Sequence, residues 1–72
     1  MKLLLFKTDI KTKKKVKSLQ PLFSKHTIIT NWSVDTEDID NVLRIETNQH
    51  LQESEIIDLI NSSGFKCEPL DD

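Results

Sequence analysis

A run of lysines between Lys11 and Lys17 holds the side chains of this 72-residue chain that are best suited to binding a charged partner. Five of its seven residues are lysines, namely Lys11, Lys13, Lys14, Lys15 and Lys17. The run coincides with the expected start of a helix, for which the Thr12 hydroxyl is a suitable N-cap. Lysines near a helix N-terminus cost roughly 0.3–1 kcal/mol each at low salt, because that end is partially positive. Folding alone would favour acids or serine here, so the run is a candidate surface for carboxylates or phosphates.

Three other side chains could ligate a metal ion, and they are His26, His50 and Cys67. Their separations match no familiar set of ligand spacings. His26 is expected in the turn after the first helix and His50 in the loop before the second, and the sequence does not bring these loops together. Cys67 is expected to share the inward face of Phe65 in the last strand, which favours a buried, inert thiol. We therefore expect no metal site and no bound cofactor.

Catalytic arrangements are not recognisable in the chain. The acidic segment 35–41 resembles a set of paired carboxylates, but such runs are usually solvated loops. Asp38 and Asp40 lack the glycine and the terminal glutamate of a calcium-binding EF-hand loop. The serines have no histidine and acid in a recognisable order. Gly64 is the only glycine, so there is no glycine-rich phosphate loop. We therefore do not expect an enzyme.

Six elements must position these residues. Four β-prone runs are expected to form strands, at residues 3–8, 27–34, 42–47 and 65–70, and Pro69 suits the end of an edge strand. The first helix follows Thr12, and Pro21 predicts a kink or an early end. The second helix begins at Gln52 with a weak capping box and ends before Gly64, which suits a left-handed C-cap.

The order β-α-β-β-α-β predicts a single ferredoxin-like domain over residues 1–72, an α+β sandwich in which two helices cover one face of a four-stranded antiparallel sheet. In the second strand, alternation predicts Ile28, Thr30, Trp32 and Val34 on the core face and Ile29, Asn31 and Ser33 on the other face. Leu3, Leu5 and Ile29 would then form a small apolar patch on the open face, either ordinary surface or a pairing surface. The expected core contains Leu4, Phe6, Ile10, Val16, Leu19, Phe23, Ile28, Trp32, Val34, Leu43, Ile45, Ile56, Leu59, Ile60 and Phe65.

Composition and charge narrow the class of protein further. One cysteine excludes an internal disulfide and fits the reducing cytoplasm. No apolar run approaches the ~20 residues of a membrane span, and the one near the start is too short for a signal peptide. Residues 1–30 hold eight lysines and one acid, a formal charge of +7, whereas residues 31–72 hold two basic residues and eleven acids, a charge of −9. Such polarity could steer partners of opposite charge or favour head-to-tail association, although charge runs are more often plain solvated surface.

Several segments together resemble the heavy-metal-associated (HMA) domains of copper chaperones and metal-transporting ATPases, especially small bacterial versions. They are Phe6-Lys7-Thr8-x-Ile10-Lys11, Val16, Pro21, Asn31-Trp32-Ser33-Val34-Asp35-Thr36, Val42-Leu43-Arg44-Ile45-Glu46 and Ser63-Gly64-Phe65-Lys66-Cys67-Glu68. In that family a Cys-x-x-Cys in the first loop binds copper(I) or zinc through thiolates. The resemblance places Thr12 and Lys15 at the two cysteine positions. A hydroxyl is a poor copper ligand and a lysine charge repels a cation, so the resemblance implies a domain that has lost its metal ligands.

Three functions stay open for the lysine run. In the first, HMA-like docking persists without the ion, and the lysines contact carboxylates on an acidic protein partner. In the second, the helix start holds an anion such as phosphate. In the third, the chain retains weak copper or zinc binding or assists a metal transporter. We do not expect nucleic-acid binding, because RNA-binding ferredoxin-like sheets need exposed aromatics that the first and third strands lack. The chain is expected to be a monomer or a weak dimer.

Overall fold

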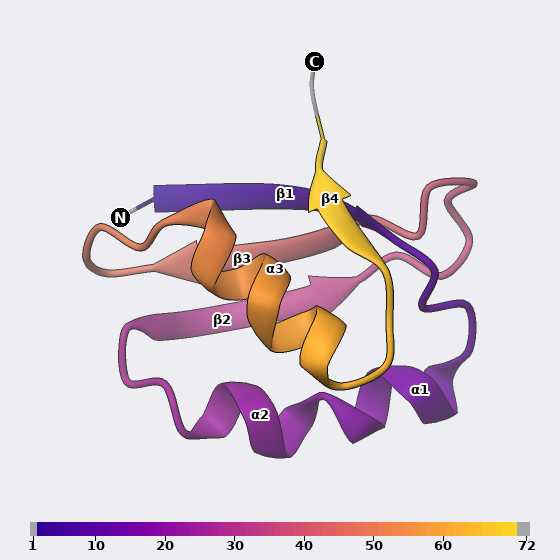
Figure 1. Cartoon of the computed structure of the whole chain (residues 1–72), viewed down its shortest axis with the longest axis horizontal. Helices are drawn as coiled ribbons and strands as arrows, with labels where there is room; N and C mark the ends of the chain where they lie inside the picture. The colour runs from indigo at the N-terminus through magenta and orange to yellow at the C-terminus, as the bar shows by residue number, and fades with distance from the viewer. Residues whose placement is uncertain (1, 71–72) are drawn as a thin grey trace.

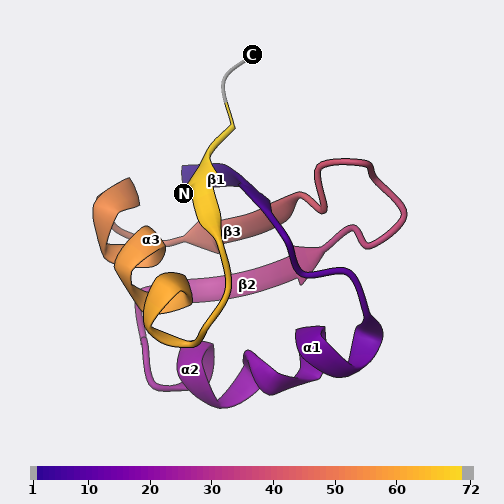
Figure 2. The ribbon, with the colours of Figure 1, turned by 45° about the vertical axis from the view of Figure 1, so that its right-hand side comes forward.

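The computed structural model describes residues 2–70, which form one antiparallel sheet covered by helices (Figure 1). The elements are β1 (Lys2–Thr8), α1 (Lys13–Ser18), α2 (Gln20–Ser24), β2 (Ile29–Val34), β3 (Leu43–Thr47), α3 (Glu53–Ser62) and β4 (Cys67–Pro69). The strand order is β2-β3-β1-β4, and all three pairings are antiparallel. This topology confirms the ferredoxin-like fold. Figure 1 shows α3 in front of the sheet, and Figures 1 and 2 both show the α1–α2 segment along the β2 side of the sheet.

The first helix is broken, as Pro21 predicts. It divides into α1 and α2, with Leu19 as the residue between them and Pro21 in the first turn of α2. Proline has no backbone N–H, so the hydrogen-bond ladder of α1 cannot continue through this position. Thr12 caps the start of α1, because its Oγ1 accepts a hydrogen bond from the Lys15 N–H at 3.2 Å. The Thr12 cap therefore sets the start of α1, and Pro21 accounts for the break between α1 and α2.

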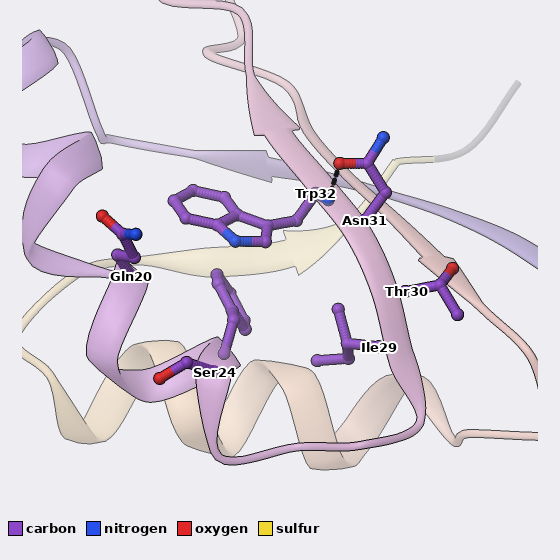
Figure 3. Close-up of a pocket in the computed structure, with 7 residues that line it drawn as sticks. Gln20, Ser24, Ile29, Thr30, Asn31 and Trp32 are labelled. Atoms are coloured by element: carbon purple, nitrogen blue, oxygen red, sulfur yellow. Dashed lines mark hydrogen bonds between the residues drawn. The ribbon is translucent and has the colours of Figure 1, made fainter.

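A β-bulge in β2 changes which of its residues face the core, so the predicted assignment of faces is wrong for part of this strand. Ile29 is opposite Thr47, but Asn31 is opposite Glu46, so Thr30 is an extra residue in the ladder. A bulge reverses the alternation on one side of it. Ile29 therefore joins Trp32 on the core side, as Figure 3 shows, and Thr30 is exposed. The strand also begins at Ile29, two residues later than expected. The ring centroids of Trp32 and Phe23 lie 4.8 Å apart.

The core lies between the sheet and the helices. Its buried apolar residues are Leu4, Phe6, Ile10, Leu19, Phe23, Leu43, Ile45, Leu51, Ile56, Ile60 and Cys67. The prediction did not include Leu51, which precedes α3. Six expected core residues are only half-buried and pack around the rim of the core: Val16, Ile28, Trp32, Val34, Leu59 and Phe65. A domain this small has little room for full burial.

The open face of the sheet carries less apolar surface than predicted. Only Leu3, which is 47% exposed, and the half-buried Leu5 remain of the expected patch, because the bulge moves Ile29 to the other face. Where β1 pairs with β3, Leu3 is opposite Glu46 and Leu5 is opposite Arg44, so each leucine has a charged residue beside it. None of the helices within residues 2–70 is long and apolar enough to cross a membrane.

Candidate functional site

The five lysines form a continuous basic surface around the start of α1. Lys11, Lys13, Lys14, Lys15 and Lys17 are all exposed, and we call them the lysine surface. Val16 and Leu19 mark the core side of the segment, since Leu19 is fully buried and Val16 packs on the core. Because a helix turns once in 3.6 residues, Lys14 and Lys17 lie opposite the core side and the other helical lysines flank them. The charge therefore faces solvent on three sides of the helix.

No acid within residues 2–70 neutralises the lysine surface. The only ion pair in this part of the chain joins Lys7 Nζ to Asp40 Oδ1 at 3.6 Å. No acidic residue occupies the first turn of α1 either. Five exposed ammonium groups with no paired carboxylate produce a positive potential that can attract an acidic partner.

Thr12 and Lys15, which the resemblance places at the lost cysteine positions, are joined by the helix cap. The Thr12 Oγ1 accepts from the Lys15 N–H, and the Thr12 carbonyl accepts from the Val16 N–H at 3.0 Å. The hydroxyl thus satisfies one of the amides that an anion at this helix end would otherwise bind. The Lys15 side chain is exposed and makes no ion pair within residues 2–70. At this position Thr12 therefore acts as the N-cap of α1 and stabilises the loop before the helix.

The acidic segment lies at the same end of the molecule as the lysine surface. We call residues 35–41 the acidic loop, and both ribbon views show it at the end where α1 begins (Figures 1 and 2). The Thr8 N–H donates to the Asp40 carbonyl at 3.1 Å, and the Thr8 hydroxyl donates to the Asn41 carbonyl at 2.6 Å. Asp9 Oδ1 accepts from the Lys66 N–H at 2.9 Å, which ties the loop before α1 to the segment before β4. The acidic loop and the lysine surface therefore lie at the same end of the molecule, and no ion pair joins them within residues 2–70.

Both histidines line one groove at the opposite end of the molecule, a placement that the sequence did not reveal. They line a groove of about 420 Å³ with Ile28, Leu51, Glu55, Ile56 and Leu59. We call it the histidine groove. Lys2 Nζ lies 3.4 Å from His50 Nδ1. Cys67, the third suggested ligand, lies apart from this groove. Within residues 2–70 no group of three or more His, Cys, Asp and Glu side chains could hold a metal ion.

Cys67 is buried in β4, as expected from its place in the sequence. Burial raises the pKa of its thiol to about 11, and the adjacent Glu68 carboxylate adds to the rise. The protonated thiol is a poor nucleophile and a poor metal ligand near neutral pH.

A second hollow, of about 270 Å³, lies between α2 and β2 (Figure 3). It is bordered by Gln20, Phe23 and Ser24 from α2 and by residues 29–32 from β2. Its polar side-chain groups are amides, hydroxyls and the indole N–H of Trp32, with no charged side chain among them. The close-up shows Trp32 pointing toward α2, where its ring meets Phe23. The hollow thus lies beside the edge strand β2.

Comparisons of the chain with protein-family models, with curated proteins and with solved structures find no match. The resemblance to HMA domains therefore remains a prediction from the residues quoted above. The fold and the exposed lysine surface are the observations from which a function can be argued.

Proposed function

We propose that this chain is a non-catalytic protein-interaction module, an HMA-like domain without metal ligands, whose lysine surface binds an acidic surface of another protein. The observation that carries the proposal is the exposure of all five lysines with no acid paired to them within residues 2–70. The fold does not require these side chains, because Val16, Leu19 and the Thr12 cap hold the segment in place. Charge without a structural role at a helix start favours a role in recognition.

The two alternatives have less support. An anion at the start of α1 would compete with the Thr12 hydroxyl for the Lys15 N–H, and α1 has only six residues. Residual copper or zinc binding would need ligands other than Thr12 and Lys15. Cys67 is a weak candidate, because its thiol is buried and protonated. We infer a cytoplasmic location because the only cysteine is unpaired.

Charge reversal tests the proposal directly. We expect the double variant Lys13→Glu, Lys14→Glu to lose partners that wild-type protein retains from a native lysate, because two attractive charges become repulsive. Lys25→Glu is the control, since Lys25 is also exposed but lies at the end of α2, outside the lysine surface. The retained proteins should elute as salt is raised, as expected for an ionic interface. An identical set of partners for the wild type and the double variant would contradict the proposal.

A further inference from the structure

The acidic loop has a charge opposite to that of the lysine surface. It carries four carboxylates, those of Asp35, Glu37, Asp38 and Asp40. The Asp40 carboxylate pairs with Lys7, whereas the other three residues are exposed and make no ion pair within residues 2–70. The five ammonium groups of the lysine surface are likewise exposed and unpaired over these residues. Two such surfaces on different molecules attract each other.

Charged neighbours do not reverse the sign of either surface. Lys7 reduces the formal charge of the acidic loop from −4 to −3, because it adds one base to four acids. Asp9, two residues before Lys11, reduces the formal charge of the lysine surface from +5 to +4. The Asp9 carboxylate also accepts the Lys66 N–H at 2.9 Å, and the Lys66 side chain is exposed. The two surfaces therefore remain complementary.

Hydrogen bonds hold the acidic loop in a shape that leaves its carboxylates open to solvent. Asp35 Oδ1 accepts from the N–H groups of Glu37 and Asp38 at 3.1 and 3.3 Å, and Asp38 Oδ1 accepts from the Asp40 N–H at 2.8 Å. In the described part of the chain no ion pair joins this loop to the lysine surface. A preorganised loop loses little conformational freedom when it binds, so both surfaces are available to a second molecule.

Ile39 gives the acidic loop an apolar side chain among its carboxylates. The residue is 93% exposed and stands between Asp38 and Asp40. A single exposed isoleucine is common and by itself indicates nothing. A lysine surface can nevertheless cover it, because the long aliphatic stems of lysines pack on apolar groups while their ammonium groups stay at carboxylates or in water. Ile39 is therefore compatible with a lysine-rich partner.

The arrangement of the two surfaces allows them to meet twice in one pair of molecules. Both ribbon views show the acidic loop on one side of the connection between β1 and α1, and α1 on the other side (Figures 1 and 2). A two-fold axis passing near this connection would place each acidic loop against the lysine surface of the other copy. Such an isologous contact is closed, so it ends at a dimer.

We propose that the lysine surface of this chain binds the acidic loop of a second copy, in a two-fold dimer that contains this contact twice. The inference rests on the proposed function, because it requires the lysine surface to bind carboxylates, and it names one partner of that surface. The dimer also regulates the surface. Copies in a dimer cover each other's lysines, so an acidic protein partner must displace the second copy.

Sedimentation velocity over a concentration series at low salt tests the dimer. Wild-type protein should pass from monomer to dimer as its concentration rises toward about 1 mM, because interfaces built from exposed charge pairs are weak. Raising salt from about 0.01 M to about 0.15 M should weaken the association severalfold through screening. Wild-type protein that stays monomeric throughout the low-salt series would overturn the proposal, and so would species that grow beyond a dimer.

Two double variants each remove one side of the contact. The loop variant is Glu37→Lys, Ile39→Lys, whose side chains take no part in the hydrogen bonds that shape the loop. The lysine variant is Lys13→Glu, Lys14→Glu. Each should associate severalfold more weakly than the wild type, whereas Asp58→Lys, at an exposed acid of α3, should not. Circular dichroism confirms that each variant is folded. A loop variant that associates as strongly as the wild type would contradict the proposal.

Mixing the two variants shows whether the two surfaces contact each other. A mixed pair keeps one unaltered contact, between the lysine surface of the loop variant and the acidic loop of the lysine variant. The mixture should therefore form more dimer than either variant alone at the same total concentration, and less than the wild type. A mixture that behaves as the average of its two components would overturn the proposed contact.

The loop variant also separates this inference from the proposed function. It retains all five lysines and should be monomeric, so it should capture the acidic partners of the wild type from a native lysate at least as well as the wild type does. If the loop variant and the wild type associate equally while the lysine variant loses its lysate partners, the dimer is wrong and the proposed function stands. If the dimer forms as described but the lysine variant keeps every lysate partner, the proposed function is wrong and the contact between copies stands.

Discussion

At the scale of single residues, Cys67 shows how burial sets chemistry. Its thiol has a pKa raised from the ordinary 9.0 to about 11, first by loss of hydration and then by the nearby Glu68 carboxylate. The folded protein therefore retains this proton over a pH range in which the unfolded chain has already released it. Stability is complete below pH 9 and falls as pH rises toward 11, since the unfolded state then binds fewer protons.

The free energy of unfolding should thus decrease between pH 9 and 11 by about 2 kcal/mol more in the wild type than in Cys67→Ala, given 1.36 kcal/mol per unit of pKa difference. Urea unfolding followed by fluorescence of Trp32, the only tryptophan, measures both proteins. The comparison removes every pH-dependent contribution that both proteins share. Parallel pH curves for the two proteins would show that the thiol is not shielded from water in the folded state.

At the scale of elements, Gly64 ends α3 with a backbone that other residues adopt at a cost. Its φ is 93°, and a Cβ placed there would meet no atom within 4 Å. The cost of a substitution is therefore conformational and includes no clash. We expect Gly64→Ala to lower the free energy of unfolding by about 1 kcal/mol and Gly64→Asn to lower it less, because asparagine tolerates positive φ better. Equal losses in the two variants by urea unfolding would point to a different cause.

Element boundaries were predictable where a local signal fixes them. The Thr12 cap, the break at Pro21, the capping box of Gln52 with Glu55 and the end at Gly64 all depend on neighbouring backbone groups. The bulge at Thr30 depends instead on how β2 pairs with β3. Threonine at this position gives no sequence signal for a bulge, as a glycine would. Likewise, the exposure of the lysines follows from their charge, whereas the placement of His26 and His50 along one groove depends on the packing of two distant loops. Features that depend on contacts between residues far apart in the chain could not be predicted from the sequence.

At the scale of the whole molecule, the net charge of −2 conceals a strong local field. The lysine surface is packed within seven residues, and the acidic loop lies at the same end of the molecule. Within residues 2–70 no ion pair joins the two, since the acidic loop pairs only with Lys7, which lies outside the lysine surface. Neighbours one helical turn apart, such as Lys13 and Lys17 or Lys14 and Lys17, repel each other at short range. Attraction between the lysine surface and the acidic loop acts over a longer distance and in water.

The balance of these two effects gives a salt dependence of stability. Raising salt from about 0.01 M to about 0.15 M shortens the Debye length from ~30 Å to ~8 Å, which weakens both effects. Because exposed lysines one helical turn apart destabilise a helix by about 0.2–0.5 kcal/mol per pair, we expect added salt to raise the free energy of unfolding of the wild type. Lys14→Gln should raise stability at low salt and reduce the response to salt, while Lys25→Gln should leave the response unchanged. If salt instead destabilised the wild type, attraction between the lysine surface and the acidic loop would outweigh the repulsion among the lysines, and the lysine surface would be less available to an acidic partner than we propose.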